Sequence, residues 1–394
     1  MNKAFLNLSL VLTLVLALAL PAWAEPVASP IPIGLALATS SNVAHFGQEQ
    51  VNGAKIAEAY LNAQGGVNGT PITLLLQDTA GDEAGAVSAF QNLIAAKVVG
   101  IVGPTLSQQA FAADPLANRA AVPVVAPSNT AKGITKLGDY ISRVSAPMGV
   151  VAPKSVQKAL ALDPRIKRAA VLYAQNDAYS TSETGVFQQT VKANGLKLVS
   201  LQKFQTTDTD FSAKAAAVLK AKAELVVISG LAEDSSRLVR QLRQSGYKGL
   251  IVGGNGFNSP NMFPLCGAVC DGVLVAQAYS PHAQSAINQE FIRKFSEAYG
   301  SPPAQFAAQA FTAVQVMVEA LRKAEQTTGK KITALDLAEA RKALNTALTS
   351  GLAFHTPLGE ISITSGGEVD QKRFYVSRIT ISPDGKTGDF VLAK

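Results

Sequence analysis

Thiols and imidazoles are scarce in this sequence of 394 residues, which contains two cysteines and three histidines. Zinc sites and Cys–His catalytic pairs are built from these residue types, so the chain has few residues that could form either. Hydrophobic residues make up 47% of the chain and charged residues 16%, a balance typical of a folded globular protein. The formal net charge of +7 is scattered rather than clustered. We therefore expect no metal, no cofactor and no nucleic-acid partner.

The two cysteines, Cys266 and Cys270, lie four positions apart. In an oxidising compartment they suit a local disulfide, and two free buried thiols are the equal alternative.

The usual catalytic motifs are missing as well. The chain has no Gly-x-Ser-x-Gly nucleophile elbow and no His-Glu-x-x-His zinc motif. Gly254 and Gly256 do not complete a dinucleotide fingerprint, because Ser259 stands where the third glycine belongs. An exported hydrolase would need a nucleophile–base pair, which three histidines on dispersed segments do not supply. The sequence predicts a binding protein rather than an enzyme.

The first 24 residues read as an export signal. A short positive start precedes a Leu-rich apolar run over residues 4–20, and Ala22-Trp23-Ala24 fits a signal-peptidase site. An uncleaved membrane anchor is the alternative, but no basic stop-transfer cluster follows the run. We expect cleavage after Ala24 and a periplasmic protein.

The rest of the chain alternates between apolar runs of strand length and segments of helical periodicity. Continuous apolar strands separated by helices indicate a parallel sheet covered on both faces. In the first half we expect strands at 31–38, 72–77, 98–102 and 122–125, and helices at 48–63, 82–96 and 107–119. The pattern restarts after Pro147, so a second α/β sheet follows. Helices are then expected at 287–299, 305–326 and 334–348, and hairpin strands within 358–392.

Small polar residues follow two strands of the first half. Ser107 stands at the start of a helix, where free N–H groups and the helix dipole favour an anion. Ser128 and Thr130 follow the next strand. Because parallel strands end at one edge of their sheet, these loops suit a carboxylate. Locally, a helix cap and a turn explain the same residues.

Equivalent strand ends supply further candidates. Phe46 follows the first strand, and Tyr179, Leu231 and Asn255 follow strands of the second half. Each alone is as well explained by packing or capping. If the two sheet edges face each other, these residues would enclose a small molecule between lobes that close about a hinge.

The ordered set of short motifs resembles the leucine/isoleucine/valine-type periplasmic binding proteins of ABC transporters. The resemblance rests on the export signal, Ile33-Gly34-Leu35, the segment 61–69 (LNAQGGVNG), Val102-Gly103-Pro104 and residues 123–127, and it covers essentially the whole mature chain. The segment 253–260 (GGNGFNSP) looks like the branch that feeds neutral amino acid uptake.

The resemblance implies two Rossmann-like lobes joined by three crossovers, which close on an amino acid. On that pattern residues 25–145 with 281–354 form the N-terminal lobe, and 146–280 with 355–394 form the C-terminal lobe. The ligand carboxylate is implied to lie on Ser107, Ser128 and Thr130, with Phe46 as an aromatic neighbour.

Two positions depart from the family pattern. An acidic side chain and a tyrosine usually hold the ligand ammonium, and this sequence has Asn255 and Leu231 there. A neutral amide does not neutralise an ammonium, and burying an unpaired charge is costly. The open alternatives are another acid (Asp177, Glu183, Glu233 or Asp234), carbonyl oxygens, or a ligand without an α-ammonium.

We therefore expect a monomeric, non-enzymatic component of an ABC importer that captures a small amino acid and delivers it to a membrane permease. One alternative is the same scaffold binding an amide, urea or carboxylic acid. The other is a sensor that signals to a receptor.

Overall fold

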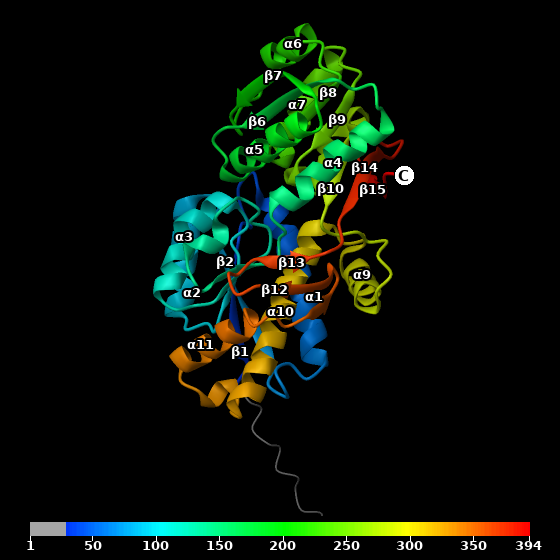
Figure 1. Cartoon of the computed structure of the whole chain (residues 1–394). Coiled ribbons are helices and arrows are strands. Elements are labelled where there is room, and N and C mark those ends of the chain that lie inside the picture. The colour runs from blue at the N-terminus through cyan, green and yellow to red at the C-terminus, as the bar shows by residue number, and fades with distance from the viewer. Residues whose placement is uncertain (1–28) are drawn as a thin grey trace, which may run out of the picture.

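The computed structural model describes residues 29–394, so the expected export signal lies outside the described residues. The chain forms two α/β lobes that stand end to end (Figure 1). The first sheet contains β1 (Ile31–Leu37), β2 (Ile72–Asp78), β3 (Ile101–Val102), β4 (Val124–Ala126) and β5 (Ile141–Arg143). Around it lie α1 (Ala44–Ala63), α2 (Glu83–Ala95), α3 (Ser107–Arg119), η1 (Ile134–Leu137), α9 (Ala286–Tyr299), α10 (Gln305–Thr328), η4 (Ile332–Ala334) and α11 (Leu337–Leu348).

The first sheet is parallel throughout, in the order β2-β1-β3-β4-β5. Successive side chains of a strand point to opposite faces, and β1 shows this directly. Ile33 and Leu35 pack into the core formed with α1 and α10. Ala36 packs with α2 and α3, and Gly34 faces Leu93 of α2. Helices therefore cover both faces, as the apolar strand pattern predicted.

One glycine sets how closely α1 and α10 approach. A Cβ atom at Gly53 of α1 would lie 2.0 Å from the carbonyl oxygen of Ala307 in α10. No side chain fits in that space, so the helix contact depends on the bare backbone at this position.

The second lobe repeats the architecture. Its strands are β6 (Arg168–Ala174), β7 (Lys197–Phe204), β8 (Leu225–Ser229), β9 (Leu250–Gly253), β10 (Leu274–Gln277), β14 (Tyr375–Ile381) and β15 (Gly388–Leu392). Its helices are α4 (Met148–Leu162), α5 (Ala178–Ala193), α6 (Ser212–Lys220), α7 (Ala232–Gln244), η2 (Asn255–Phe257), α8 (Met262–Cys266) and η3 (Gly267–Cys270). The strand order is β15-β14-β10-β9-β8-β6-β7, with the last two strands of the chain added antiparallel at one edge. The predicted α/β class with two lobes is confirmed.

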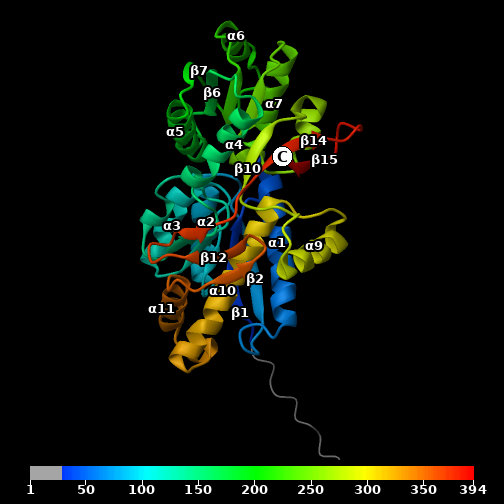
Figure 2. The ribbon, with the colours of Figure 1, turned by 45° about the vertical axis from the view of Figure 1, so that its right-hand side comes forward.

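A small antiparallel sheet joins the lobes near the C-terminus. It contains β11 (Phe354–Thr356), β12 (Gly359–Ile363) and β13 (Val369–Gln371), and its buried side chains belong to the core of the first lobe. The chain then returns to the second sheet at β14 (Figure 2). The lobe boundary expected at residue 354 thus falls inside β11. We propose that residues 355–371 belong with the first lobe, because their apolar face is buried there.

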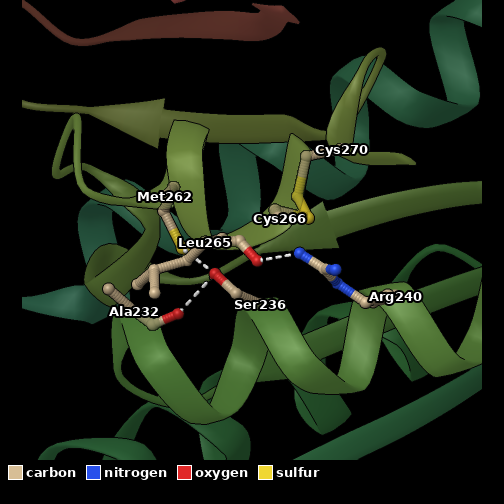
Figure 3. The surroundings of a disulfide bond; sticks show 7 residues. All are labelled: Ala232, Ser236, Arg240, Met262, Leu265, Cys266 and Cys270. Carbon is tan, nitrogen blue, oxygen red and sulfur yellow. Dashed lines mark hydrogen bonds between the residues drawn. A yellow bond between two sulfur atoms is a disulfide. The ribbon is translucent and has the colours of Figure 1, made fainter. Parts of the chain in front are cut away.

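Cys266 and Cys270 form a disulfide, with their Cα atoms 5.6 Å apart. This is one of the two alternatives that the sequence left open. The bridged segment lies against α7, where the guanidinium of Arg240 donates to the carbonyl of Leu265 (Figure 3). The disulfide therefore fixes a surface segment of the second lobe.

Candidate functional site

The two sheets bring their strand ends to a common crevice. In the order β2-β1-β3, the helices that follow β1 and β3 begin on either side of a topological switch point, and β7-β6-β8 repeats this arrangement in the second lobe. Open α/β sheets bind ligands at such points, outside the carboxyl ends of the strands. The starts of α1, α3, α5 and α7 are therefore where a ligand site is expected.

A cavity lies there, with walls from both lobes. It is lined by Phe46, Thr105, Leu106, Ser107, Ser128, Tyr179, Leu231, Asn255, Gly256 and Phe306. None of these residues is an Asp, Glu, Lys, Arg or His. The wall is apolar with a few polar groups, a composition typical of small-molecule sites.

The structure brings six of the seven residues singled out from the sequence to this wall: Phe46, Ser107, Ser128, Tyr179, Leu231 and Asn255. Thr130 lies outside it, and its hydroxyl is buried without a hydrogen-bond partner among the described residues. Sequence reasoning missed Phe306, whose ring centroid lies 4.8 Å from that of Phe46. Phe306 lies in the first turn of α10, far along the chain, so no local pattern marks it.

Hydrogen bonds inside the first lobe engage the Ser128 hydroxyl both as a donor and as an acceptor. Its Oγ donates to the carbonyl of Thr105 at 2.7 Å and accepts from Nε2 of Gln50 at 2.7 Å. Thr105 Oγ1 in turn donates to Gln50 Oε1 at 2.7 Å and accepts from the amide of Ala38 at 3.0 Å. These side chains hold the two loops together rather than offering free groups to a ligand.

Ser107 is different, because its hydroxyl proton has no acceptor among residues 29–394. Its Oγ accepts a hydrogen bond from the amide of Ala131 at 3.3 Å. Ser107 is also the first residue of α3, whose first N–H groups lack partners within the helix and whose dipole is positive at this end. The first lobe therefore presents donors and positive potential to the cavity.

On the second lobe, Tyr179 stands between the cavity and a buried carboxyl. Its hydroxyl donates to Glu183 Oε2 at 2.7 Å and accepts from the amide of Gly256 at 2.9 Å. Glu183 Oε1 accepts from the amide of Asn255 at 2.9 Å. Burial raises the pKa of Glu183 to about 7, and burial also raises the pKa of Tyr179. Glu183 thus lies behind the wall and supports it.

The other acids considered from the sequence are also off the wall. Asp177 caps α5 by accepting from the amide of Ser180, and burial raises its pKa. Asp234 is buried, and burial raises its pKa well above the usual range. Glu233 pairs with Arg237 on the surface of α7. None of these three carboxyls lines the cavity.

The side chain of Asn255 is held from two directions. Its Oδ1 accepts from Nε2 of Gln305 at 2.8 Å and from Nδ2 of Asn258 at 3.3 Å. Gln305 belongs to α10 of the first lobe, so this bond also crosses between the lobes.

Two more hydrogen bonds join the lobes around the cavity. The amide of Lys132 donates to Ser182 Oγ at 2.8 Å, and the hydroxyl of Ser259 donates to Glu49. The lobes are therefore in contact around the cavity, which is the arrangement expected of a closed binding protein.

The structure describes residues 29–394. Within that range, no helix has the length and apolar character needed to cross a membrane. The same residues contain no group of three or more His, Cys, Asp and Glu side chains placed to hold a metal ion.

Comparisons with known proteins agree with this architecture. The Leu/Ile/Val-binding protein BraC3 of Rhizobium johnstonii is 27% identical over 358 residues, which is 90% of this chain and 92% of that protein. A branched-chain amino acid transporter substrate-binding protein of Streptococcus pneumoniae, solved with isoleucine, superposes with a TM-score of 0.80 at 24% identity, covering 92% of this chain and all of that chain. A solute-binding protein of Rhodopseudomonas palustris, solved with 3,4-dihydroxybenzoic acid, gives a TM-score of 0.79 at 23% identity and covers 92% and 96%.

The model of the family described as "Periplasmic binding protein" matches residues 30–386, which is nearly all of the described chain. The two α/β lobes and the cavity at their facing strand ends agree with this match. The chain belongs to the periplasmic binding protein family.

Proposed function

We propose that this chain is the solute-binding component of an ABC importer. It captures a small carboxylate-bearing solute in the interlobe cavity and presents it to a membrane permease from the periplasm. The observation that carries the proposal is Ser107 at the start of α3, with a free hydroxyl proton on the wall of a cavity closed by both lobes. A helix N-terminus and a hydroxyl donor together suit a carboxylate.

The apolar wall suits a solute with a hydrophobic body. Phe46 and Phe306 contribute one side of it, and Leu106 and Leu231 contribute further apolar surface. Neutral amino acids have these properties, and the Rhizobium and Streptococcus relatives support that choice through what their names state. A carboxylic acid without an amine is the second candidate. It is favoured by the uncharged wall and supported by the dihydroxybenzoic acid in the Rhodopseudomonas protein.

A binding role rather than catalysis is part of the proposal. The cavity wall carries no His, Cys, Asp or Glu that would serve as a nucleophile or base. A sensor that passes the closed state to a receptor would use the same cavity. Uptake of the labelled solute by cells with and without the gene separates the two roles, because only an importer component is required for uptake.

Thermal unfolding against a panel of neutral amino acids, hydroxy acids, oxo acids, benzoates, amides and urea tests the ligand class. A ligand that binds only the folded protein raises its unfolding temperature. We expect shifts with carboxylates and none with amides or urea. Ser107→Ala should weaken binding about tenfold or more, the cost of roughly one charge-assisted hydrogen bond. Ser212→Ala is the matched control, since Ser212 is also the first residue of a helix but is exposed on α6. Stabilisation by amides alone would refute the proposal.

A further inference from the structure

Every side-chain oxygen on the cavity wall already accepts a hydrogen bond from the protein. The five pairs are Thr105 Oγ1 with the Ala38 amide, Ser107 Oγ with the Ala131 amide, Ser128 Oγ with Gln50 Nε2, Tyr179 Oη with the Gly256 amide, and Asn255 Oδ1 with Gln305 Nε2. Each of these oxygens therefore already uses at least one of its lone pairs before a ligand arrives.

The donors on the wall are not all used. The hydroxyls of Thr105, Ser128 and Tyr179 donate to Gln50, to a backbone carbonyl and to Glu183. The hydroxyl proton of Ser107 and the amide NH₂ of Asn255 have no acceptor among residues 29–394. Each lobe thus contributes one free side-chain donor.

The orientation of the Asn255 amide follows from its neighbours. The backbone amide of Ala278 can only donate, and it donates to Gln305 Oε1 at 2.7 Å. Gln305 must then turn its NH₂ toward Asn255, which receives it on Oδ1 at 2.8 Å. Asn258 acts the same way, because its Nδ2 donates to the carbonyl of Ala276 at 3.0 Å and to Asn255 Oδ1 at 3.3 Å. The NH₂ of Asn255 is the group left for a ligand.

Charge distinguishes the two ends of the cavity. The Ser107 end lies at the positive terminus of α3 and favours an anion. The Asn255 end lies over the carboxyl of Glu183, which accepts from the backbone N–H of Asn255 at 2.9 Å and disfavours a second anion. An ammonium would meet no carboxylate on the wall itself and would face the NH₂ of Asn255, so no charged side chain of the wall would pair with it.

Resting on the proposed function, we infer that the ligand is a monocarboxylic acid with an apolar body and a neutral acceptor oxygen (a hydroxyl or carbonyl), and without an ammonium group. Its carboxylate binds Ser107 and its acceptor binds the Asn255 amide. Gln305, which is not part of the wall, determines specificity by holding Asn255 as a donor.

Two ligand pairs of matched shape test this. Leucine and its 2-oxo acid differ only at Cα, where a carbonyl oxygen replaces the ammonium and the α-hydrogen. The pair 4-(aminomethyl)benzoate and 4-(hydroxymethyl)benzoate places the amine or hydroxyl farther from the carboxylate. Titration calorimetry on full-length protein, refolded to remove any bound solute, measures all four dissociation constants. We expect the acceptor member to bind at least tenfold more tightly in at least one pair. Tighter binding of the ammonium member in either pair would overturn the inference and leave the proposed function standing. Binding of amides but of no carboxylate would refute the proposed function itself.

Variants are compared by the ratio of the two dissociation constants within a ligand pair. A substitution that only disturbs the fold would leave this ratio unchanged. Asn255→Asp replaces the donor by an acceptor and should shift the ratio at least tenfold toward the ammonium member. In Gln305→Glu the new carboxylate can only accept a hydrogen bond from Asn255. The side-chain amide of Asn255 should then rotate by half a turn, which shifts the ratio in the same direction. Asn261→Asp adds the same charge outside the cavity wall and should leave the ratio unchanged. An unchanged ratio in both Asn255→Asp and Gln305→Glu would contradict the role of the Gln305–Asn255 pair.

Discussion

Arg143 and Glu368 form an ion pair between the end of β5 and the turn before β13, with Nη2 and Oε2 2.8 Å apart. The guanidinium is buried, and its Nη1 donates to the carbonyls of Asn129 and Ala131 at 2.9 and 3.0 Å. Ala131 is also the residue whose amide bonds to Ser107. The ion pair therefore positions the loop that orients the proposed carboxylate-binding serine.

Glu368→Gln should weaken ligand binding although Glu368 does not line the cavity. The buried Arg143 loses the charge of its partner, so the loop at 129–131 is held less firmly and Ser107 with it. We expect roughly a tenfold rise in Kd, equivalent to about 1.4 kcal/mol. Titration calorimetry with a ligand identified from the panel measures it. Glu360→Gln is the control, because Glu360 is exposed on β12. Equal affinities of Glu368→Gln and the native protein would show that the ion pair does not position the loop.

Contact between Glu49 and Ser259 should make closure depend on pH. Burial raises the pKa of Glu49 to about 8 where the lobes meet, against an ordinary value of 4.5. A raised carboxyl pKa means that the closed form binds the proton more tightly, so its stabilisation is full below about pH 4.5 and is lost as the pH rises to about 8. His45 on the same helix has its pKa lowered to about 4 by burial, so it stays neutral through this window.

Ligand affinity, measured by calorimetry between pH 5 and pH 9, is therefore expected to fall with rising pH and to level off above about pH 8. Glu49→Gln, which keeps an acceptor for Ser259, should flatten part of that dependence. Glu83→Gln, on the exposed start of α2, should not. Identical pH profiles for Glu49→Gln and the native protein would contradict the prediction.

Much of the fold was predictable because the period of apolar residues is a local property. The helix at 107–119 was expected at the bounds that the structure has. The short strand β5 was missed, since its three residues include a serine and an arginine whose burial depends on Glu368. That partner lies 225 positions away, beyond the reach of any local pattern.

The site divides in the same way. Ser107 was predictable, because a small hydroxyl residue between a strand end and a helix start has a local signature. The use of the Ser128 hydroxyl was not, because its partner Gln50 reads only as a polar residue on a helix. The orientation of Asn255 was equally out of reach, since it depends on Gln305 from the other lobe.

Loss of the disulfide should lower stability and leave binding intact. The bridge closes a loop of five residues, for which the chain-entropy estimate is about 2 kcal/mol. Neither cysteine lines the cavity. The double variant Cys266→Ser/Cys270→Ser should therefore unfold at lower urea concentration and bind the ligand within about twofold of the native protein. Reduction of the native protein by dithiothreitol should have the same effect, and a large loss of affinity in either case would contradict this assignment.

Asp114 of α3 is completely buried, and neither of its carboxyl oxygens has a hydrogen-bond partner among the described residues. Burial raises its pKa well above the usual 3.8. The folded protein therefore retains a proton that the unfolded chain releases near pH 4. The contribution of Asp114 to the free energy of unfolding is greatest below that pH and is lost as the pH rises. Asp114→Asn cannot ionise, so it should gain stability relative to the native protein by up to about 1.4 kcal/mol for each pH unit between pH 4 and pH 7. Urea unfolding at pH 4, 5.5 and 7 measures the difference, with the exposed Asp139→Asn as control. A constant difference across this range would mean that the carboxyl ionises in the folded protein as readily as in water.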